Sequence, residues 1–141
     1  MTSILISRSH CMFILVLLFS MAAASSVTAQ ETVHFSTDQV EAGQAIYRET
    51  CQICHGNRLS NGQFGTPLRG SFFRKNWAGK SLGELVQHTW EKMPPDNVES
   101  LTWDQVTEVL SFILARNDLV AGDTPMTTDM ETLNTIALPW K

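Results

Sequence analysis

Any fold of this sequence has to accommodate the five-residue segment Cys51-Gln52-Ile53-Cys54-His55. Two thiols separated by two residues and followed directly by an imidazole are what covalent attachment of a haem requires. Each thiol can form a thioether with one vinyl group of the porphyrin, and the adjacent histidine is then placed to bind the iron. The motif therefore predicts that Cys51 and Cys54 attach a haem and that His55 is its proximal ligand.

The cysteine count agrees with this interpretation. The chain contains three cysteines, and Cys11 lies in an N-terminal stretch that we expect to be removed. Three interpretations compete for Cys51 and Cys54: haem anchors, a redox-active pair, and half of a zinc site. A redox-active CxxC is expected in a βαβ pattern, and a structural zinc site needs four ligands. The sequence offers neither context, so haem attachment is favoured and the other two interpretations stay open.

Residues 1–29 have the pattern of a secretory signal peptide. Arg8 and the terminal amine form a weakly cationic start, residues 12–24 are apolar, and Val27-Thr28-Ala29 supplies small residues for cleavage. An uncleaved membrane anchor is the alternative, but this apolar run is shorter than the roughly 20 residues that span a bilayer. We therefore expect export, cleavage after Ala29, and a single domain over residues 30–141.

That domain is small and acidic. It contains nine Lys and Arg residues against fourteen Asp and Glu residues, and it has no basic run. Nucleic acid is therefore not expected as a partner. A chain this short has limited apolar surface to bury, so we expect a haem at its centre to form part of the core.

Three helices are predicted, each by a capping box followed by apolar residues at helical spacing. The boxes pair Ser36 with Gln39, Ser81 with Glu84, and Thr102 with Gln105. The apolar faces contain Val40, Gly43, Tyr47 and Cys51; Leu82, Leu85, Val86, Thr89 and Trp90; and Val106, Val109, Leu110 and Ile113. Strand alternation is nearly absent, so the predicted fold class is all-α. The helical core should cover about residues 37–116, with a long loop over 56–79 and a tail over 117–141.

With these residues the chain resembles the class I cytochromes c, over about residues 37–120. The spacings Gly43-x-x-x-Tyr47-x-x-x-Cys51 and Val109-x-x-Phe112 match the family's closely crossing terminal helices. A glycine lets two backbones approach and an aromatic ring fills the adjoining space. The resemblance implies three main helices wrapped around one covalently bound haem. It also implies a periplasmic location, because c-type haem is attached outside the cytoplasm.

Met93 is the residue that the resemblance implies as the second axial ligand. It follows the second predicted helix in Lys92-Met93-Pro94-Pro95, which matches the family's distal-ligand motif. The two prolines stiffen the segment that has to hold the thioether. Four rivals are expected to stay off the iron, in solvent or packed on the surface: His34, His88, Met126 and Met130.

The resemblance also implies a set of residues around the haem. Pro67 follows His55 at the spacing at which the family has a proline whose carbonyl accepts the Nδ1 proton of the proximal histidine. Leu68, Phe72 and Phe73 should line the haem pocket, and Trp77 should either bind a propionate or pack against its neighbours. In its short loop the chain is similar to small bacterial cytochromes associated with periplasmic dehydrogenases, including quinoprotein alcohol dehydrogenases.

An iron bound by both His55 and Met93 has no open position, so the resemblance implies electron transfer and not catalysis. We expect a single-haem carrier between periplasmic redox proteins, with a quinoprotein or other dehydrogenase as donor and an oxidase or another cytochrome as acceptor. Two alternatives stay open. One is a fixed haem subunit of a dehydrogenase complex, docked through the apolar residues of the tail. The other, less favoured, is a haem enzyme or gas-binding protein with a labile sixth ligand. No membrane span is expected in the mature chain.

Overall fold

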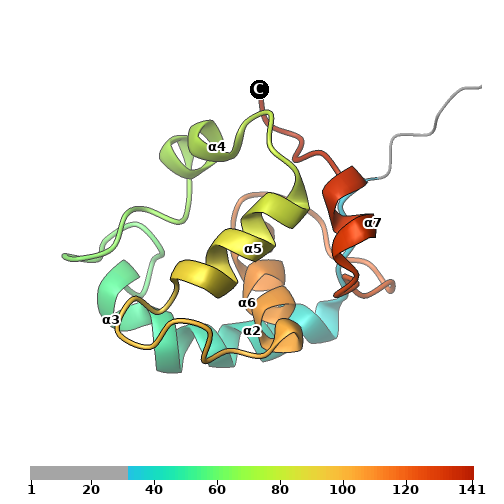
Figure 1. Ribbon diagram of the computed structural model, residues 1–141. Coiled ribbons are helices and arrows are strands. Elements are labelled where there is room, and N and C mark those ends of the chain that lie inside the picture. The colour runs from blue at the N-terminus through green and yellow to red at the C-terminus, as the bar shows by residue number, and fades with distance from the viewer. Residues whose placement is uncertain (1–31) are drawn as a thin grey trace, which may run out of the picture.

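The computed structural model describes residues 32–141, which form an all-helical domain (Figure 1). The predicted signal peptide lies outside the described residues. In chain order the elements are α2 (Thr37–Ile46), the π-helical η1 (Tyr47–Cys51), α3 (Gln52–His55), α4 (Ser71–Trp77), α5 (Leu82–Lys92), α6 (Trp103–Ala115) and α7 (Met130–Thr135). None of the described residues forms a strand beyond two isolated bridges. The predicted all-α fold class is confirmed. No helix within residues 32–141 is long and apolar enough to cross a membrane.

All three predicted capping boxes are present. At the start of α2, Ser36 Oγ accepts a hydrogen bond from Gln39 N at 3.1 Å, and Gln39 Oε1 accepts one from Ser36 N at 3.2 Å. The same reciprocal pairs begin α5, between Ser81 and Glu84, and α6, between Thr102 and Gln105. These bonds satisfy backbone donors that a helix leaves unpaired at its N-terminus. The three predicted helix starts are therefore confirmed.

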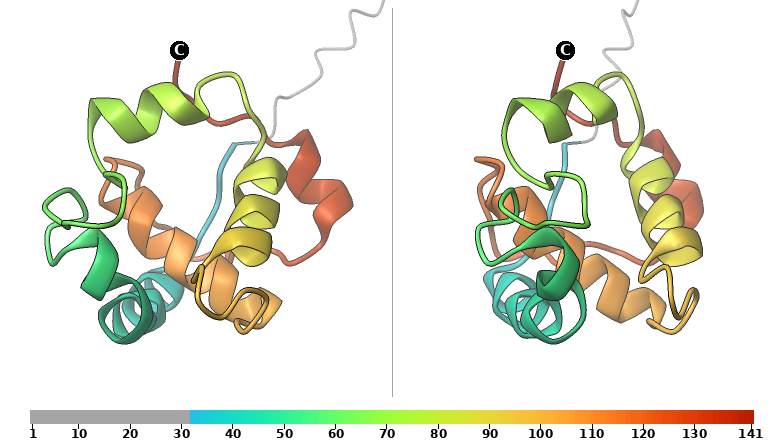
Figure 2. Two further views of the ribbon diagram at one scale, coloured as in Figure 1. Left: turned by 60° about the vertical axis from the view of Figure 1, so that its left-hand side comes forward. Right: turned by 90° about the vertical axis from the view of Figure 1, so that its left-hand side faces the viewer.

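Helices α2 and α6 cross in close contact, as the glycine and aromatic spacings predict (Figure 2). A Cβ atom at position 43 would overlap the backbone carbonyl of Glu108, so only glycine permits this approach. Beside the crossing, the rings of Tyr47 and Phe112 lie 5.3 Å apart between centroids. The predicted inner face of α6 is buried and consists of Val106, Val109, Leu110 and Ile113.

The long segment between α3 and α5 is not a continuous loop, because it contains α4. Asn117, at the end of α6, ties this segment to the core. Its side-chain amide donates hydrogen bonds to Leu68 O at 2.8 Å and Ile113 O at 2.9 Å, and its Oδ1 accepts one from Gly70 N at 3.0 Å. The side chain is 2% exposed. One buried amide thus holds the start of α4 against α6.

The tail after α6 packs on its own domain and adds the short helix α7, which lies beside α5 in Figures 1 and 2. Gln39 of α2 holds the tail through two hydrogen bonds with the backbone of Met126, at 2.6 and 3.0 Å. Further along, Leu82 N donates to Ile136 O at 2.8 Å. The apolar tail residues that are buried are Met126, Leu133, Ile136 and Leu138. Much of the apolar surface on which the docked-subunit alternative relied is therefore covered by the domain itself, whereas Val120 of the tail is 88% exposed.

Candidate haem site

The helix type changes along the chain at the Cys51–His55 motif. After α2 the chain continues as the π-helical η1, in which Gln52 N bonds to Tyr47 O, and then as α3. A wider π turn rotates the residues that follow it relative to an unbroken α-helix, and such turns often occur at functional sites. The residues of the motif therefore do not continue the helical face of α2. The periodicity in the sequence did not indicate this change.

His55 is held in one orientation. Its ring is buried, with 8% of the residue exposed, and its Nδ1 lies 2.8 Å from the carbonyl oxygen of Thr66. A carbonyl only accepts, so Nδ1 carries the proton and Nε2 keeps its lone pair for a metal. The predicted acceptor was Pro67, and this was wrong by one residue. The spacing from His55 could not resolve which of two consecutive carbonyls turns toward the ring.

Two glycines bring the following loop directly against the motif. A Cβ atom at Gly65 would lie 2.5 Å from His55 Nδ1, and one at Gly62 would overlap the carbonyl of Cys54. Gly65 N also donates to Cys54 O at 2.8 Å. The loop can pass this close to the ring only because these positions lack side chains, and this passage places the Thr66 carbonyl beside Nδ1.

The environment of the two thiols bears on the interpretations that the sequence left open. Burial, with a further contribution from Cys54, raises the pKa of the Cys51 thiol to about 11. Redox-active pairs need the opposite, a thiol whose pKa is lowered. Within residues 32–141 no group of three or more His, Cys, Asp or Glu side chains is placed to hold a metal ion. The structure thus supports neither a thioredoxin-like pair nor a zinc site in the described part of the chain.

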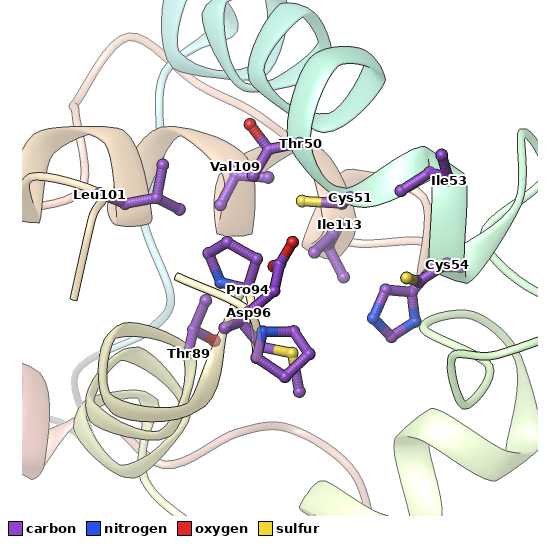
Figure 3. A pocket seen from close by; sticks show the side chains of 13 residues that line it. Thr50, Cys51, Ile53, Cys54, Thr89, Pro94, Asp96, Leu101, Val109 and Ile113 are labelled. Atoms are coloured by element: carbon purple, nitrogen blue, oxygen red, sulfur yellow. The ribbon is translucent and has the colours of Figure 1, made fainter. Parts of the chain in front are cut away.

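A cavity of about 280 Å³ lies between α3, α5, α6 and the segment after α5. This volume is at the lower end of the range of small-molecule sites. Figure 3 shows Cys51 and Cys54 on the side of α3, Thr89 on the side of α5, and Val109 and Ile113 on α6. The other residues that line it are Thr50, Ile53, His55, Met93, Pro94, Pro95, Asp96 and Leu101. The cavity therefore brings both cysteines and the histidine of the motif together with Met93.

Met93 reaches this cavity because α5 ends there. Its backbone N–H makes a last helical hydrogen bond to Thr89 O at 3.0 Å, and its own backbone is extended. The two prolines that follow cannot continue the helix. The chain therefore turns away after Met93 and leaves its thioether as the only sulfur in the lining besides the two cysteines.

None of the four rival ligands lines this cavity. His88 is exposed, with its ring edge-on to Trp77 at 5.4 Å, and partial burial and nearby lysines lower its pKa. His34 is also exposed, and its Nε2 lies 3.0 Å from a threonine hydroxyl. Met126 is buried in the core, and Met130 packs against the core. Met93 is left as the candidate partner of His55.

The predicted pocket residues around α4 do not line the cavity: Pro67, Leu68, Phe72, Phe73 and Trp77. The phase of α4 explains where its aromatics lie, because Phe73 points into the core against Trp140 at 5.6 Å while Phe72 is 48% exposed. Trp77 packs against Phe73, which agrees with one of the two roles predicted for it. The Lys80 ammonium lies 4.6 Å from the centroid of its ring. The loop prediction missed α4, so the direction of these side chains could not be foreseen.

The structure also adds residues to the site that sequence reasoning did not select. Thr50, Ile53 and Leu101 line the cavity, and so does the carboxylate residue Asp96. Ile53 belongs to the motif, and Asp96 directly follows the segment Lys92-Met93-Pro94-Pro95 that the sequence singled out. Leu101 carries no such signal, because it reaches the cavity only through the turn of residues 93–101, in which Glu99 N donates to Trp90 O at 3.2 Å.

The donor set fits a covalently bound haem. Two thiols lie on one wall, an imidazole whose Nδ1 is engaged elsewhere offers Nε2, and a thioether lines the same cavity. Most of the remaining lining is apolar, and its low polarity suits a porphyrin face. Such a set can hold an iron porphyrin through two covalent bonds and two axial ligands.

Comparison with known proteins gives two matches. A family model described as "Cytochrome C oxidase, cbb3-type, subunit III" matches residues 38–113. In three dimensions the chain is similar to a chain in the crystal structure of the sulfane dehydrogenase SoxCD from Paracoccus pantotrophus, with a TM-score of 0.51 and 22% sequence identity. The similarity covers 84% of this chain and 66%, just under two thirds, of that one, and it indicates a shared fold. No curated protein matches the sequence.

Proposed function

Because the chain belongs to the cytochrome c family described as cbb3-type cytochrome c oxidase subunit III, we propose that it carries one electron at a time between redox proteins. Proteins of this family, with its class I cytochrome c fold, are electron-transfer haem proteins, and this chain is one of them. One observation supports the proposed role as a carrier. A single cavity collects Cys51, Cys54, His55 and Met93, with the His55 ring fixed by Thr66.

In this proposal each residue has a separate task. A bound haem supplies a one-electron iron couple. Cys51 and Cys54 would attach it, and the His55 Nε2 and the Met93 thioether would bind its iron. A soft thioether and an apolar surrounding both favour the reduced state, which raises the reduction potential. With both of these ligands bound, the iron would have no position left for a substrate, so we propose a carrier and not an enzyme.

We further propose that the protein works in the periplasm and receives electrons from a dehydrogenase. The expected signal peptide and the extracytoplasmic attachment of c-type haem support the location. The similarity to a chain of a sulfane dehydrogenase supports the donor class, and it also keeps a fixed subunit of such a complex as a second arrangement. Gel filtration after purification from the native cell separates the two, because a free carrier elutes as a small protein.

Carbon monoxide tests the carrier function. The reduced, haem-loaded protein at neutral pH should bind no carbon monoxide on the time scale of seconds, since Met93 occupies the sixth position. The measurement is the visible spectrum before and after addition of the gas. Rapid conversion to a carbonyl spectrum would contradict the proposal and favour a gas-binding or peroxidase-like protein with a labile ligand.

A further inference from the structure

Charge is distributed unevenly along this acidic chain. Residues 50–83 contain five of its ten Lys and Arg residues and none of its fourteen Asp and Glu residues. The rest of the chain carries all fourteen carboxylates against the other five cations. This cationic segment, residues 50–83, begins at the haem-attachment motif and ends in the first turn of α5. The one strongly positive stretch thus includes one wall of the candidate haem site.

In the fold, the cationic segment occupies one side of the molecule. Figures 1 and 2 show α3, the following loop and α4 together on this side, while α7 lies on the opposite side. Within residues 32–141 only one cation of the segment forms an ion pair, Arg74 with Asp118 at 3.1 Å. Arg58, Arg69 and Lys75 are exposed and have no carboxylate partner among these residues. Their charge is therefore free to act on another molecule.

Exposed apolar side chains accompany these cations. Five large hydrophobic residues stand out as exposed among those described, and three of them belong to the cationic segment: Ile53, Phe64 and Phe72. Ile53 is 82% exposed and also lines the cavity, so it marks the cavity's mouth. Phe64, on the loop that packs behind the motif, is 81% exposed. Exposed apolar groups on the same side of a protein as unpaired charges are typical of protein interaction sites.

The segments that line the cavity differ in charge. Ile53 lines it from the cationic segment, whereas the exposed Asp96 lines it from the segment after α5. Glu99 follows Asp96 on the same loop and is also exposed. A charged partner would therefore be drawn to one of these segments and repelled by the other, which gives the encounter a direction.

We propose that Ile53 and Phe64, with the exposed cations Arg58, Arg69 and Lys75 on the same side of the molecule, form the docking surface for a redox-partner protein whose own surface carries carboxylates around a small apolar centre. This inference rests on the proposed electron-transfer function. The cations steer such a partner to the cavity mouth even though the whole chain is acidic. The two apolar side chains add buried area to what needs to be only a small, transient interface.

Film voltammetry on gold electrodes tests this surface, with alkanethiol monolayers standing in for the partner. The haem-loaded mature chain should adsorb and give a reversible wave on a carboxylate-terminated monolayer at low salt, in spite of its net negative charge. The wave should fade as salt shortens the Debye length to about 10 Å at 0.1 M. Adsorption and electron exchange only on an amine-terminated monolayer would overturn the inference and leave the carrier function intact.

A matched pair of variants separates local from overall charge. Replacing Arg58→Gln and Lys75→Gln should lower the adsorbed amount about tenfold on the carboxylate surface. The control, Thr124→Glu with Thr128→Glu in the exposed part of the tail, changes the net charge equally and should lower it far less. Equal losses in both variants would overturn the inference, because only the overall charge would then matter.

Phe64→Ser tests the apolar part of the surface. This variant should adsorb less than the parent chain on a mixed carboxylate and methyl monolayer, and equally on a pure carboxylate one. If the variant adsorbs as much as the parent chain on both monolayers, Phe64 is not part of the docking surface. Absence of any wave on either the carboxylate or the amine monolayer would overturn the electron-transfer function and this inference with it.

Discussion

At the residue scale, the site depends on how each donor atom is held. The hydrogen bond from His55 Nδ1 to the Thr66 carbonyl fixes the ring and its tautomer, and it leaves the lone pair on Nε2. Gly65 makes this bond possible by leaving room behind the ring. Met93 is positioned differently, by the end of α5 and by the two prolines after it. The backbone thus sets the positions of both candidate ligands.

Replacing Met93→Ala should remove the sulfur ligand while leaving the attached haem in place. The weak near-infrared band of a sulfur-to-iron bond in the oxidised protein should disappear, and the reduction potential should fall. A lost preference of about 3 kcal/mol for the reduced state corresponds to roughly 130 mV, since about 59 mV accompanies each tenfold change for one electron. Spectroscopy and voltammetry measure both effects. Met130→Ala, a partly buried methionine in the tail, is the control, and an unchanged band in Met93→Ala would assign the ligand elsewhere.

At the scale of elements, the contact between α2 and α6 carries the motif. Gly43 lets the two helices approach, and the Tyr47 hydroxyl donates a hydrogen bond to Gly56 O at 2.7 Å, just after the motif. The π-helical η1 lies between these two anchors. The position of Cys51 and His55 relative to α6 is therefore set by helix packing as well as by the motif.

Gly43→Ala tests this contact. In an exposed helix the change would stabilise by up to about 1 kcal/mol, but here the added methyl group meets the Glu108 carbonyl. Overpacking costs about 1–3 kcal/mol, so the free energy of unfolding should fall by about 2 kcal/mol. Denaturant unfolding of the haem-loaded protein measures it. Gly122→Ala, where a Cβ atom meets nothing within 4 Å, should stay within about 0.5 kcal/mol of the parent. A stabilised Gly43→Ala would refute the close crossing.

Asn117→Asp tests the link between α6 and the segment before α4. The change replaces a buried amide nitrogen, which donates to two carbonyls, with an oxygen that repels them. Loss of buried hydrogen bonds at this site should cost about 3 kcal/mol in unfolding free energy. The same substitution at the exposed Asn76 of α4 should have almost no effect. If the two variants have the same free energy of unfolding, the Asn117 amide does not hold the two segments together as its three hydrogen bonds indicate.

At the scale of the whole molecule, the tail closes the domain. It runs from the end of α6 past α2 to α5, with an isolated bridge at each contact, Ser36 with Gly122 and Ser81 with Ala137. Trp140, the next-to-last residue, packs against Phe73 of α4. The tail thus joins α2, α4 and α5, which are distant in the sequence.

Asp129, which caps α7, gives this closure a pH dependence. Hydrogen bonds from the side chain and backbone of Thr132 lower the pKa of the Asp129 carboxyl in the folded state. Its contribution to stability is therefore complete above the ordinary carboxyl pKa of about 4 and is lost as the pH falls through the lowered value. Asp129→Asn should unfold at a lower temperature than the parent at pH 7, and the difference should shrink toward pH 3. Asp123→Asn, another exposed carboxylate of the tail, is the control, and a difference that does not depend on pH would contradict this role.

Local patterns in the sequence were sufficient for the haem motif, the all-α class and the three capped helices. Each of these depends on residues within a few positions of one another, such as Ser36 with Gln39 or Cys51 with His55. Only the tertiary structure decided that Thr66 and not Pro67 meets His55, that Phe73 points away from the cavity, and that the tail packs on its own domain. These outcomes depend on contacts between distant segments and on the phase of the short α4, which no nearby residue announces.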